Sequence, residues 1–272
     1  GERIDVAKLT AFLLDWHPDF VALITYDDIP QKARNWTGLG GDDPIFVPSL
    51  DQQLPDGIEP NDYFSPHHLT CVGAPIALVV AKSQLVAQEL SNFVRSQCIH
   101  FEEQPGVTFD EAIEQELFYP QSPPTDPSLT HLAEIVRPGS NTEWLASPAE
   151  VPFNAGGKTL PVVSGGCSTG YQNHFYLETM NTLAVPGENR SITLHVASQD
   201  IADNQYVAAG VLGVPAANIQ VKLTRLGGGF GGRQSRSRFN STASAVAAWV
   251  LNQPVRLVLD RNTNFITCGE RH

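Results

Sequence analysis

Gly227-Gly228-Gly229-Phe230-Gly231-Gly232 is the stretch from which the rest of this sequence is most easily understood. Five glycines around one aromatic residue leave the backbone almost without Cβ atoms, so the loop can adopt positive φ angles and approach a ligand closely. Residues 219–223 before it alternate like a half-buried strand, and the alanine-rich segment 239–251 after it has the apolar face of a helix. This order of strand, glycine loop and helix predicts an anion-binding loop, because free amides and a helix N-terminus favour negative charge.

The composition is that of a folded globular protein with an acidic surface. The chain has 272 residues, of which 42% are hydrophobic and 17% charged, and a formal net charge of −12. This charge argues against nucleic acid or an anionic membrane as a partner, and no apolar run approaches the ~20 residues of a transmembrane helix. The four cysteines are scattered without zinc-site or CxxC spacing. Free thiols indicate a reducing, cytoplasmic compartment.

Two domains with an α+β or mixed α/β fold are predicted. The first, residues 1–119, contains helices at 5–16 and 83–97, strands at 20–26, 76–80 and 99–102, and a long aperiodic loop at 31–67. The proline-rich segment 120–128 is the predicted linker. The second domain, residues 129–272, contains strands at 182–185, 191–197, 219–223 and 255–259 and helices at 201–212 and 239–251. Gly213 is expected to end the helix at 201–212.

The glycine loop also matches a dinucleotide-binding fingerprint. Gly227, Gly229 and Gly232 satisfy G-x-G-x-x-G, and Asp260 ends the next strand, where an acid that binds a ribose belongs. However, Asp260 lies well beyond the ~20 residues of the usual spacing. The polar segment 233–237 also stands where a nucleotide-binding helix needs small apolar residues. A nicotinamide-linked dehydrogenase is therefore the alternative enzyme class.

A second segment, residues 171–178, places amide, imidazole and carboxylate groups among three aromatic residues. Taken alone, it favours a buried strand in which Gln172 and Glu178 satisfy neighbouring backbone groups. His174 has no second ligand at metal-binding spacing, so no metal ligand is predicted.

Taken together, these segments resemble the molybdenum hydroxylases, the family of xanthine dehydrogenase and aldehyde oxidase. The resemblance is carried by Q-x-H-F-Y-L-E-T at 172–179, a helix ending in L-G-V-P at 199–215, G-G-G-F-G-G at 227–232, and P-V-R, L-D-R and G-x-R-H within 254–272. Residues 26–30 and 72–77 resemble the family's α/β hammerhead domain. The resemblance implies a hammerhead domain at 1–119 and the first part of a molybdopterin-binding domain at 129–272.

By this resemblance the glycine loop holds molybdopterin rather than NAD. Gln172 matches a family glutamine that hydrogen-bonds an oxygen on molybdenum, and Gly229, Phe230 and Gly231 match the part of the loop beside the cofactor. The Phe230 amide is expected to donate to an oxygen ligand, and neither side chain is expected to ligate the metal. The family's general base, a glutamate, lies downstream of His272, so no catalytic residue is expected within the chain.

The resemblance also implies the reaction of a longer parent protein. Members of the family insert water-derived oxygen into an aldehyde or an N-heterocycle such as a purine. The electrons leave through 2Fe-2S clusters and FAD, which lie upstream of Gly1, to NAD or O2. The parent is expected to be a homodimer, and the 272 residues alone are expected to show no turnover. A non-catalytic binding relative of the family is the third alternative.

Gln234 is the informative departure from the family pattern. This position resembles a glutamate that contacts the purine in xanthine dehydrogenases, whereas aldehyde oxidases generally lack the acid. A neutral amide cannot supply the same charge-assisted hydrogen bond. The following residues 235–237 are nevertheless closer to the dehydrogenase sequence. We predict that Gln234 contacts substrate and favours aldehydes; the alternative is a solvated loop residue without a substrate role.

Overall fold

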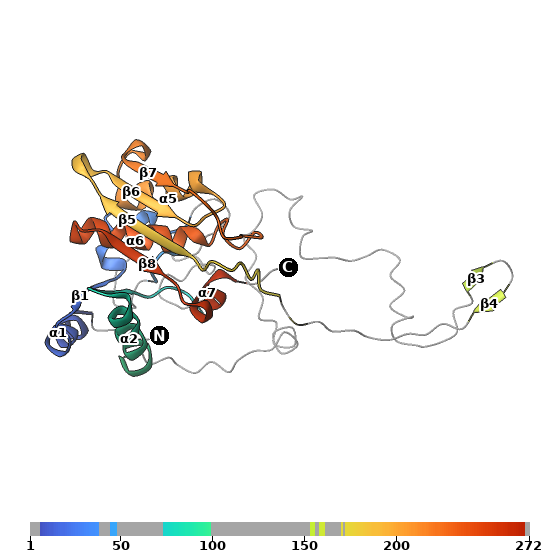
Figure 1. The fold of residues 1–272 in the computed structure, drawn as a ribbon, viewed down its shortest axis with the longest axis horizontal. Coiled ribbons are helices and arrows are strands. Elements are labelled where there is room, and N and C mark those ends of the chain that lie inside the picture. Colours follow the sequence, from blue (N-terminus) through green and yellow to red (C-terminus); the bar gives the residue numbers. More distant parts are fainter. Residues whose placement is uncertain are drawn as a thin grey trace.

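The structure is a computed structural model, shown in Figure 1, that describes residues 6–37, 44–47, 73–98, 153–155, 158–160, 170 and 172–269. The strand expected at 99–102 and the linker expected at 120–128 lie outside the described residues. The division into two domains therefore stays a prediction, whereas the mixed α/β character is confirmed.

A four-stranded sheet forms the centre of the C-terminal part. Its order is β7-β6-β5-β8, with β5 at Asn181–Pro186, β6 at Ile192–Val196, β7 at Ile219–Lys222 and β8 at Val255–Val258. Strand β5 is antiparallel to β6 and β8, and β6 is parallel to β7. The two edge strands, β7 and β8, are therefore those that precede and follow the glycine loop in sequence.

Two helices pack against each other and against this sheet (Figure 1). Helix α5 spans Ile201–Leu212, as predicted, because the Asp200 side chain caps its first turn and Gly213 ends it in the left-handed region at φ 68°. Helix α6 spans Ser237–Leu251 and starts slightly earlier than predicted. Its small residues are buried through almost all of residues 237–248, which lets α6 lie close to both the sheet and α5.

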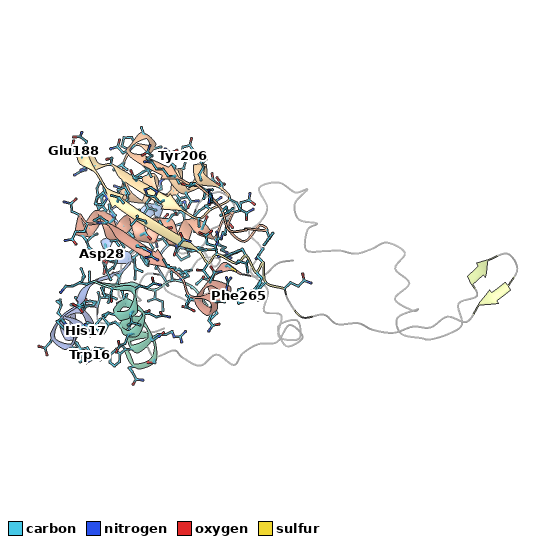
Figure 2. The ribbon with its side chains drawn as sticks, in the orientation of Figure 1. Trp16, His17, Asp28, Glu188, Tyr206 and Phe265 are labelled. Atoms are coloured by element: carbon cyan, nitrogen blue, oxygen red, sulfur yellow. The ribbon has the colours of Figure 1, made fainter. Side chains whose placement is uncertain are left out.

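The N-terminal part contributes two helices and a two-stranded antiparallel sheet. Helix α1 (Val6–Trp16) leads to β1 (Phe20–Ile24), and β2 (Leu78–Ala81) leads to α2 (Gln84–Phe93), which continues as a π-helical turn over Val94–Cys98. Apolar residues of these elements form a core of their own: Leu9, Leu13, Phe20, Leu23, Leu90 and Val94. Trp16, labelled in Figure 2, lies at its margin and packs on Phe93.

A larger core joins the N-terminal and C-terminal parts. It unites Ile24, Tyr26 and Phe46 with apolar residues of the four-stranded sheet and of α5 and α6. The backbone amide of Gln31 donates to the carbonyl of Val211 at 3.0 Å. The N-terminal part therefore packs directly on the layer that carries the glycine loop.

Two features were not anticipated from the sequence. A short antiparallel hairpin pairs β3 (Phe153–Ala155) with β4 (Lys158–Leu160). Helix α7 spans Arg261–Cys268, and its sequence is polar on average. No helix in the described ranges is long and apolar enough to cross a membrane.

Candidate functional site

The glycine loop connects β7 to α6 and adopts the backbone that only bare residues permit. Gly228 and Gly231 have φ values of 90° and 94°, in the left-handed region that glycine tolerates. Phe230 between them also has a positive φ, 53°, and the residue is 64% exposed. A non-glycine residue held at such a φ is uncommon and worth attention. The loop therefore presents one exposed aromatic ring on a nearly bare turn.

The segment at 172–180 lies directly beside this loop. A Cβ atom at Gly228 would meet the Tyr176 Cβ at 3.2 Å, and one at Gly232 would lie 2.7 Å from the His174 ring. The Glu178 amide also donates to the Gly227 carbonyl, at 3.4 Å. The two stretches singled out separately in the sequence therefore form one structural unit, and the glycines are needed for their close contact.

Glu178 joins the beginning of the loop to its end. Its Oε2 atom accepts hydrogen bonds from the Gly227 amide at 2.8 Å and from Arg233 Nη1 at 2.7 Å, and its Oε1 accepts from Asn181 Nδ2 at 3.1 Å. Burial acts to raise the pKa of Glu178, but these hydrogen bonds outweigh it and lower that pKa below its usual value. Glu178 is therefore a carboxylate at neutral pH and satisfies a backbone group, as predicted, but the expected buried strand is wrong: residues 173–180 form no strand, and Phe175 and Leu177 are exposed.

Arg233 is completely buried although it follows the loop directly. Its guanidinium lies 4.3 Å from the centroid of the Tyr176 ring, within cation–π range. Its Nε and Nη2 atoms have no hydrogen-bond acceptor within the described part of the chain. The Tyr176 hydroxyl accepts from Asn264 Nδ2 of α7 at 2.7 Å, and burial raises the pKa of Tyr176 to about 12. From the sequence, Arg233 stands out only as too polar for a nucleotide-binding helix. Its contacts with the Glu178 carboxylate and the Tyr176 ring were not predicted.

Gln199 supports the loop from the connection between β6 and α5. Its Oε1 accepts from the amides of Gly231 at 2.9 Å and Arg233 at 3.3 Å. A Cβ at Gly229 would lie 2.4 Å from this side chain. Gln199 was noted in the sequence as part of the 199–215 motif. Its neighbours along the chain gave no sign that its side chain contacts the glycine loop.

The amides at the tip of the loop differ from those at its ends. Gly227, Gly231 and Arg233 donate their amides to Glu178 or Gln199. No hydrogen bond to an acceptor in the described residues leaves from the amides of Gly228, Gly229 or Phe230. Consecutive free amides in a turn form an anion-binding concavity. The loop can therefore bind an anionic or oxygen-rich ligand at its tip without breaking a contact that shapes it.

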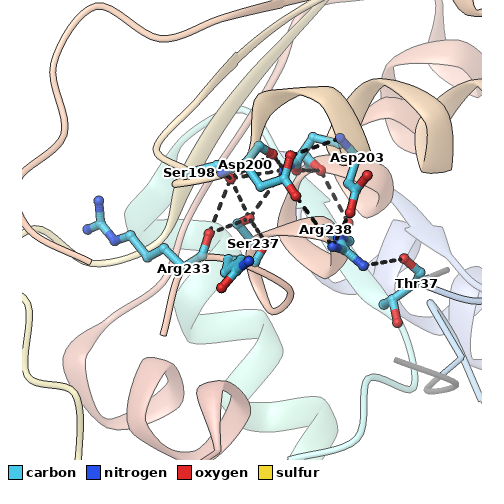
Figure 3. Close-up of polar contacts among 10 residues, drawn as sticks. Thr37, Ser198, Asp200, Asp203, Arg233, Ser237 and Arg238 are labelled. Atoms are coloured by element: carbon cyan, nitrogen blue, oxygen red, sulfur yellow. Dashed lines mark hydrogen bonds and ion pairs between the residues drawn. The ribbon is translucent and has the colours of Figure 1, made fainter. Parts of the chain in front are cut away.

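A buried polar network holds the starts of α5 and α6 together behind the loop (Figure 3). Ser198 Oγ lies 2.8 Å from Ser237 Oγ and donates to the Arg233 carbonyl at 3.2 Å, and Asn204 Nδ2 donates to Ser198 Oγ at 2.9 Å. Because the Arg233 backbone belongs to both the network and the loop, the helix starts and the loop are held in one fixed relation.

Arg238 extends this network to the N-terminal part. Its guanidinium pairs with Asp203, lies 3.6 Å from Asp200, and donates to the Thr37 carbonyl at 3.3 Å (Figure 3). Burial raises the pKa of Asp203, while the Arg238 charge acts to lower it. Arg238 therefore faces two carboxylates and contacts the N-terminal part with the same guanidinium.

The other predicted site residues stand at the margins of this unit. Gln172 is exposed two residues before His174, and no contact between Gln172 and Phe230 is seen among the described residues, so their shared cavity stays a prediction. Gln234 is exposed at the end of the loop, and its amide donates to the Gly231 carbonyl at 3.3 Å. Within the described ranges no three His, Cys, Asp or Glu side chains cluster as a metal site.

The dinucleotide-binding alternative does not fit this geometry. Strands β7 and β8 lie at opposite edges of the sheet, whereas a dinucleotide fold places the two strands of its first β-α-β unit close together in the sheet. Asp260, the candidate ribose ligand, instead caps α7 by accepting from the Thr263 amide at 3.0 Å. Two of the amides that would face a pyrophosphate are engaged by Glu178 and Gln199.

Comparison with known proteins agrees with the geometry. The molybdopterin cofactor-binding domain family matches residues 151–272. The chain is 34% identical over 257 residues to a xanthine dehydrogenase/oxidase of Felis catus, covering 94% of this chain and 16% of that protein. It is 36% identical over 202 residues to a xanthine dehydrogenase of Dictyostelium discoideum, covering 74% of this chain and 13% of that protein.

A solved structure, the aldehyde oxidoreductase from Desulfovibrio gigas, shares the fold with a TM-score of 0.61 and 19% identity, covering 99% of this chain and 26% of that one. The chain thus spans between about an eighth and a sixth of the length of these two curated relatives (13% and 16%). The glycine loop and the segment at 172–180 both lie inside the matched family region. On these grounds the chain belongs to the molybdenum hydroxylase family.

Proposed function

We propose that this chain forms part of the molybdopterin site of a molybdenum hydroxylase that oxidises an aldehyde or an N-heterocycle with oxygen derived from water. The observation that carries the proposal is the tip of the glycine loop, where the amides of Gly228, Gly229 and Phe230 have no acceptor in the described part of the chain while the flanking amides are held by Glu178 and Gln199. The similarity to xanthine dehydrogenases and to an aldehyde oxidoreductase supports both substrate classes.

The residues present fit a flat, phosphate-bearing cofactor. A Cβ at Gly231 would meet nothing closer than His174 at 3.8 Å, so the loop is open at this point. The free tip amides favour oxygen or anionic groups. The Arg233 guanidinium offsets the negative charge of Glu178, so the carboxylate beside the loop does not repel an anionic group. These features suit a pterin that carries a phosphate.

The chain's residues act by binding and orienting. Molybdopterin, when bound, supplies the two-electron redox chemistry of molybdenum, which the protein tunes and directs. In our proposal the Phe230 amide and the Gln172 side chain donate hydrogen bonds toward the metal end of the cofactor. Gly229 and Gly231 provide close backbone approach, and Gln234 faces the substrate. The general base, the 2Fe-2S clusters, the FAD and the NAD or O2 acceptor belong to the parent protein, which we propose is a cytoplasmic homodimer.

The proposed function is tested by the cofactor content of the full-length parent protein. We expect molybdenum and pterin in near-stoichiometric amounts, measured by metal analysis and by fluorescence of the oxidised pterin released on denaturation. Turnover of an aldehyde or a hypoxanthine-type heterocycle should accompany them. A purified, folded parent that contains bound NAD and neither molybdenum nor pterin would contradict the proposal. Bound cofactor without turnover would instead indicate the non-catalytic alternative.

The substrate preference is tested by Gln234→Glu in the same parent protein. A carboxyl group at this exposed position can form a charge-assisted hydrogen bond with a purine, which the amide cannot. We expect kcat/KM for xanthine to rise by about tenfold, since such bonds contribute ~1.5 kcal/mol or more. The value for an aromatic aldehyde, measured in parallel, should stay within about twofold. If kcat/KM changes for neither substrate, Gln234 is a solvated loop residue and its assignment to the substrate is wrong.

A further inference from the structure

We propose that Glu178 and Arg233 are positioning residues whose ion pair holds the two ends of the glycine loop together and so orients the free amides of Gly228, Gly229 and Phe230. The pair links Gly227, the first residue of the loop, to Arg233, the residue directly after the loop. The expected effect of this ion pair on cofactor binding rests on the proposed function. Its structural content, a loop closed by an ion pair, can be tested without any cofactor.

A single oxygen atom carries the connection. Glu178 Oε2 accepts from the Gly227 amide at 2.8 Å and from Arg233 Nη1 at 2.7 Å. Gln199 holds the amides of Gly231 and Arg233 from the other side, but does not reach Gly227 by any hydrogen bond within the described residues. Removing the Glu178 charge therefore breaks the ion pair and weakens the acceptor for the Gly227 amide, so that the first end of the loop relies mainly on the 3.4 Å bond from the Glu178 amide to the Gly227 carbonyl, while Gln199 still holds the second end.

The pair is poorly explained as a source of stability. Arg233 is fully buried, yet two of its nitrogens have no acceptor among the described residues, and its partner Glu178 is 37% exposed. Burying a charge that is incompletely hydrogen-bonded contributes little net stability and can be unfavourable. Its geometry is nevertheless strictly held, because the guanidinium lies against the Tyr176 ring. A requirement for loop shape accounts for this arrangement.

Both members of the pair are fixed by neighbouring elements. Asn181 at the start of β5 donates to the second oxygen of Glu178. Asn264 of α7 donates to the Tyr176 hydroxyl at 2.7 Å and accepts from the Met180 amide at 2.8 Å. The ring that supports the guanidinium is therefore tied to the helix after β8. The loop ends are held against the sheet and α7 rather than by contacts within the loop.

The test compares Glu178→Gln with Glu188→Gln in the full-length parent protein. Both changes remove one negative charge, but Glu188 is exposed and lies at the opposite end of the sheet from Phe265 of α7 (Figure 2). We expect Glu178→Gln to speed hydrogen exchange of the 227–233 amides in the cofactor-free protein by about tenfold or more, with exchange in α6 unchanged. Pterin affinity should fall about tenfold to a hundredfold, as for other residues that orient a cofactor's direct contacts. Glu188→Gln should match wild type in both.

Arg233→Lys and Arg233→Met test the other half of the pair. Lysine keeps the charge but lacks the planar guanidinium that contacts the Tyr176 ring. In Arg233→Lys, the hydrogen exchange rate of the loop amides and the loss of pterin affinity should therefore lie between those of wild type and Arg233→Met. Arg233→Lys also carries the test if Glu178→Gln yields no folded protein. Loop exchange equal to wild type in these variants, or an increase spread evenly over β5 and α6, would overturn the inference. Loop opening in a parent that binds no pterin would instead retain the inference and refute the proposed function.

Discussion

Gly232→Ala is expected to abolish most molybdenum and pterin binding by the full-length parent protein. A Cβ at this position would lie 2.7 Å from His174 Cγ, 2.8 Å from Tyr176 Cε1 and 2.9 Å from His174 Cβ. Because one of these atoms is next to the backbone, a side-chain rotation cannot relieve the clash. The loop and the segment that carries Gln172 must then move apart, and we expect the molybdenum content to fall by about tenfold or more. A displacement of about 1 Å in an active site can lower the reaction rate on the order of a hundredfold.

Gly210→Ala is the matched control for this substitution. Gly210 lies inside α5, and a Cβ there would meet nothing within 4 Å. Alanine at an unstrained helical position stabilises by about 0.4–1 kcal/mol, so the cofactor content should equal that of wild type. Both variants are measured by metal analysis on protein of equal purity. Full molybdenum occupancy in Gly232→Ala would show that the contact between the two segments is not needed for the site.

Arg238→Met is expected to weaken the packing of the N-terminal part on the sheet and helices. The side chain is 3% exposed, pairs with Asp203, lies near Asp200, and donates to the Thr37 carbonyl. Methionine of similar length leaves two carboxylates without their cation, and removing one partner of a buried pair costs about 3–5 kcal/mol. Hydrogen exchange in α5 and α6 of the parent protein should then become faster by about a hundredfold to a few thousandfold, since 1.4 kcal/mol corresponds to a factor of ten.

The control for Arg238 is Arg256→Met, at an exposed position of β8. This change removes the same charge without breaking a buried pair, so exchange in α5 and α6 should change less than about threefold. Equal exchange in the two variants would show that the Arg238 network contributes no more than a surface charge. A second comparison, Asp203→Asn, should reduce exchange protection less than Arg238→Met, because Asp200 still faces the arginine.

The geometry also explains why the glycine motif, which is compatible with either a dinucleotide or molybdopterin, does not form a dinucleotide site here. G-x-G-x-x-G is satisfied, but the sheet order separates β7 from β8 and Asp260 caps a helix. The spacing of Asp260 and the polar residues after the loop already counted against a dinucleotide. Arg233, which made the segment look wrong for a nucleotide-binding helix, is the residue that closes the loop through Glu178.

The local elements and the family follow largely from the sequence alone. The end of α5 depends on neighbouring residues, Gly213 in the left-handed region and Pro215 after it, so the predicted bounds of α5 match the structure. Helix α7 is not evident in the sequence, because its residues are polar on average and Asp260, which caps it, also fits the ribose position of the dinucleotide alternative. What holds the glycine loop is set by tertiary contacts. Gly227, Glu178, Gln199 and Arg233 meet through contacts between distant segments, and the sequence around a Gln or a Glu gives no sign of which distant amide its side chain will accept from.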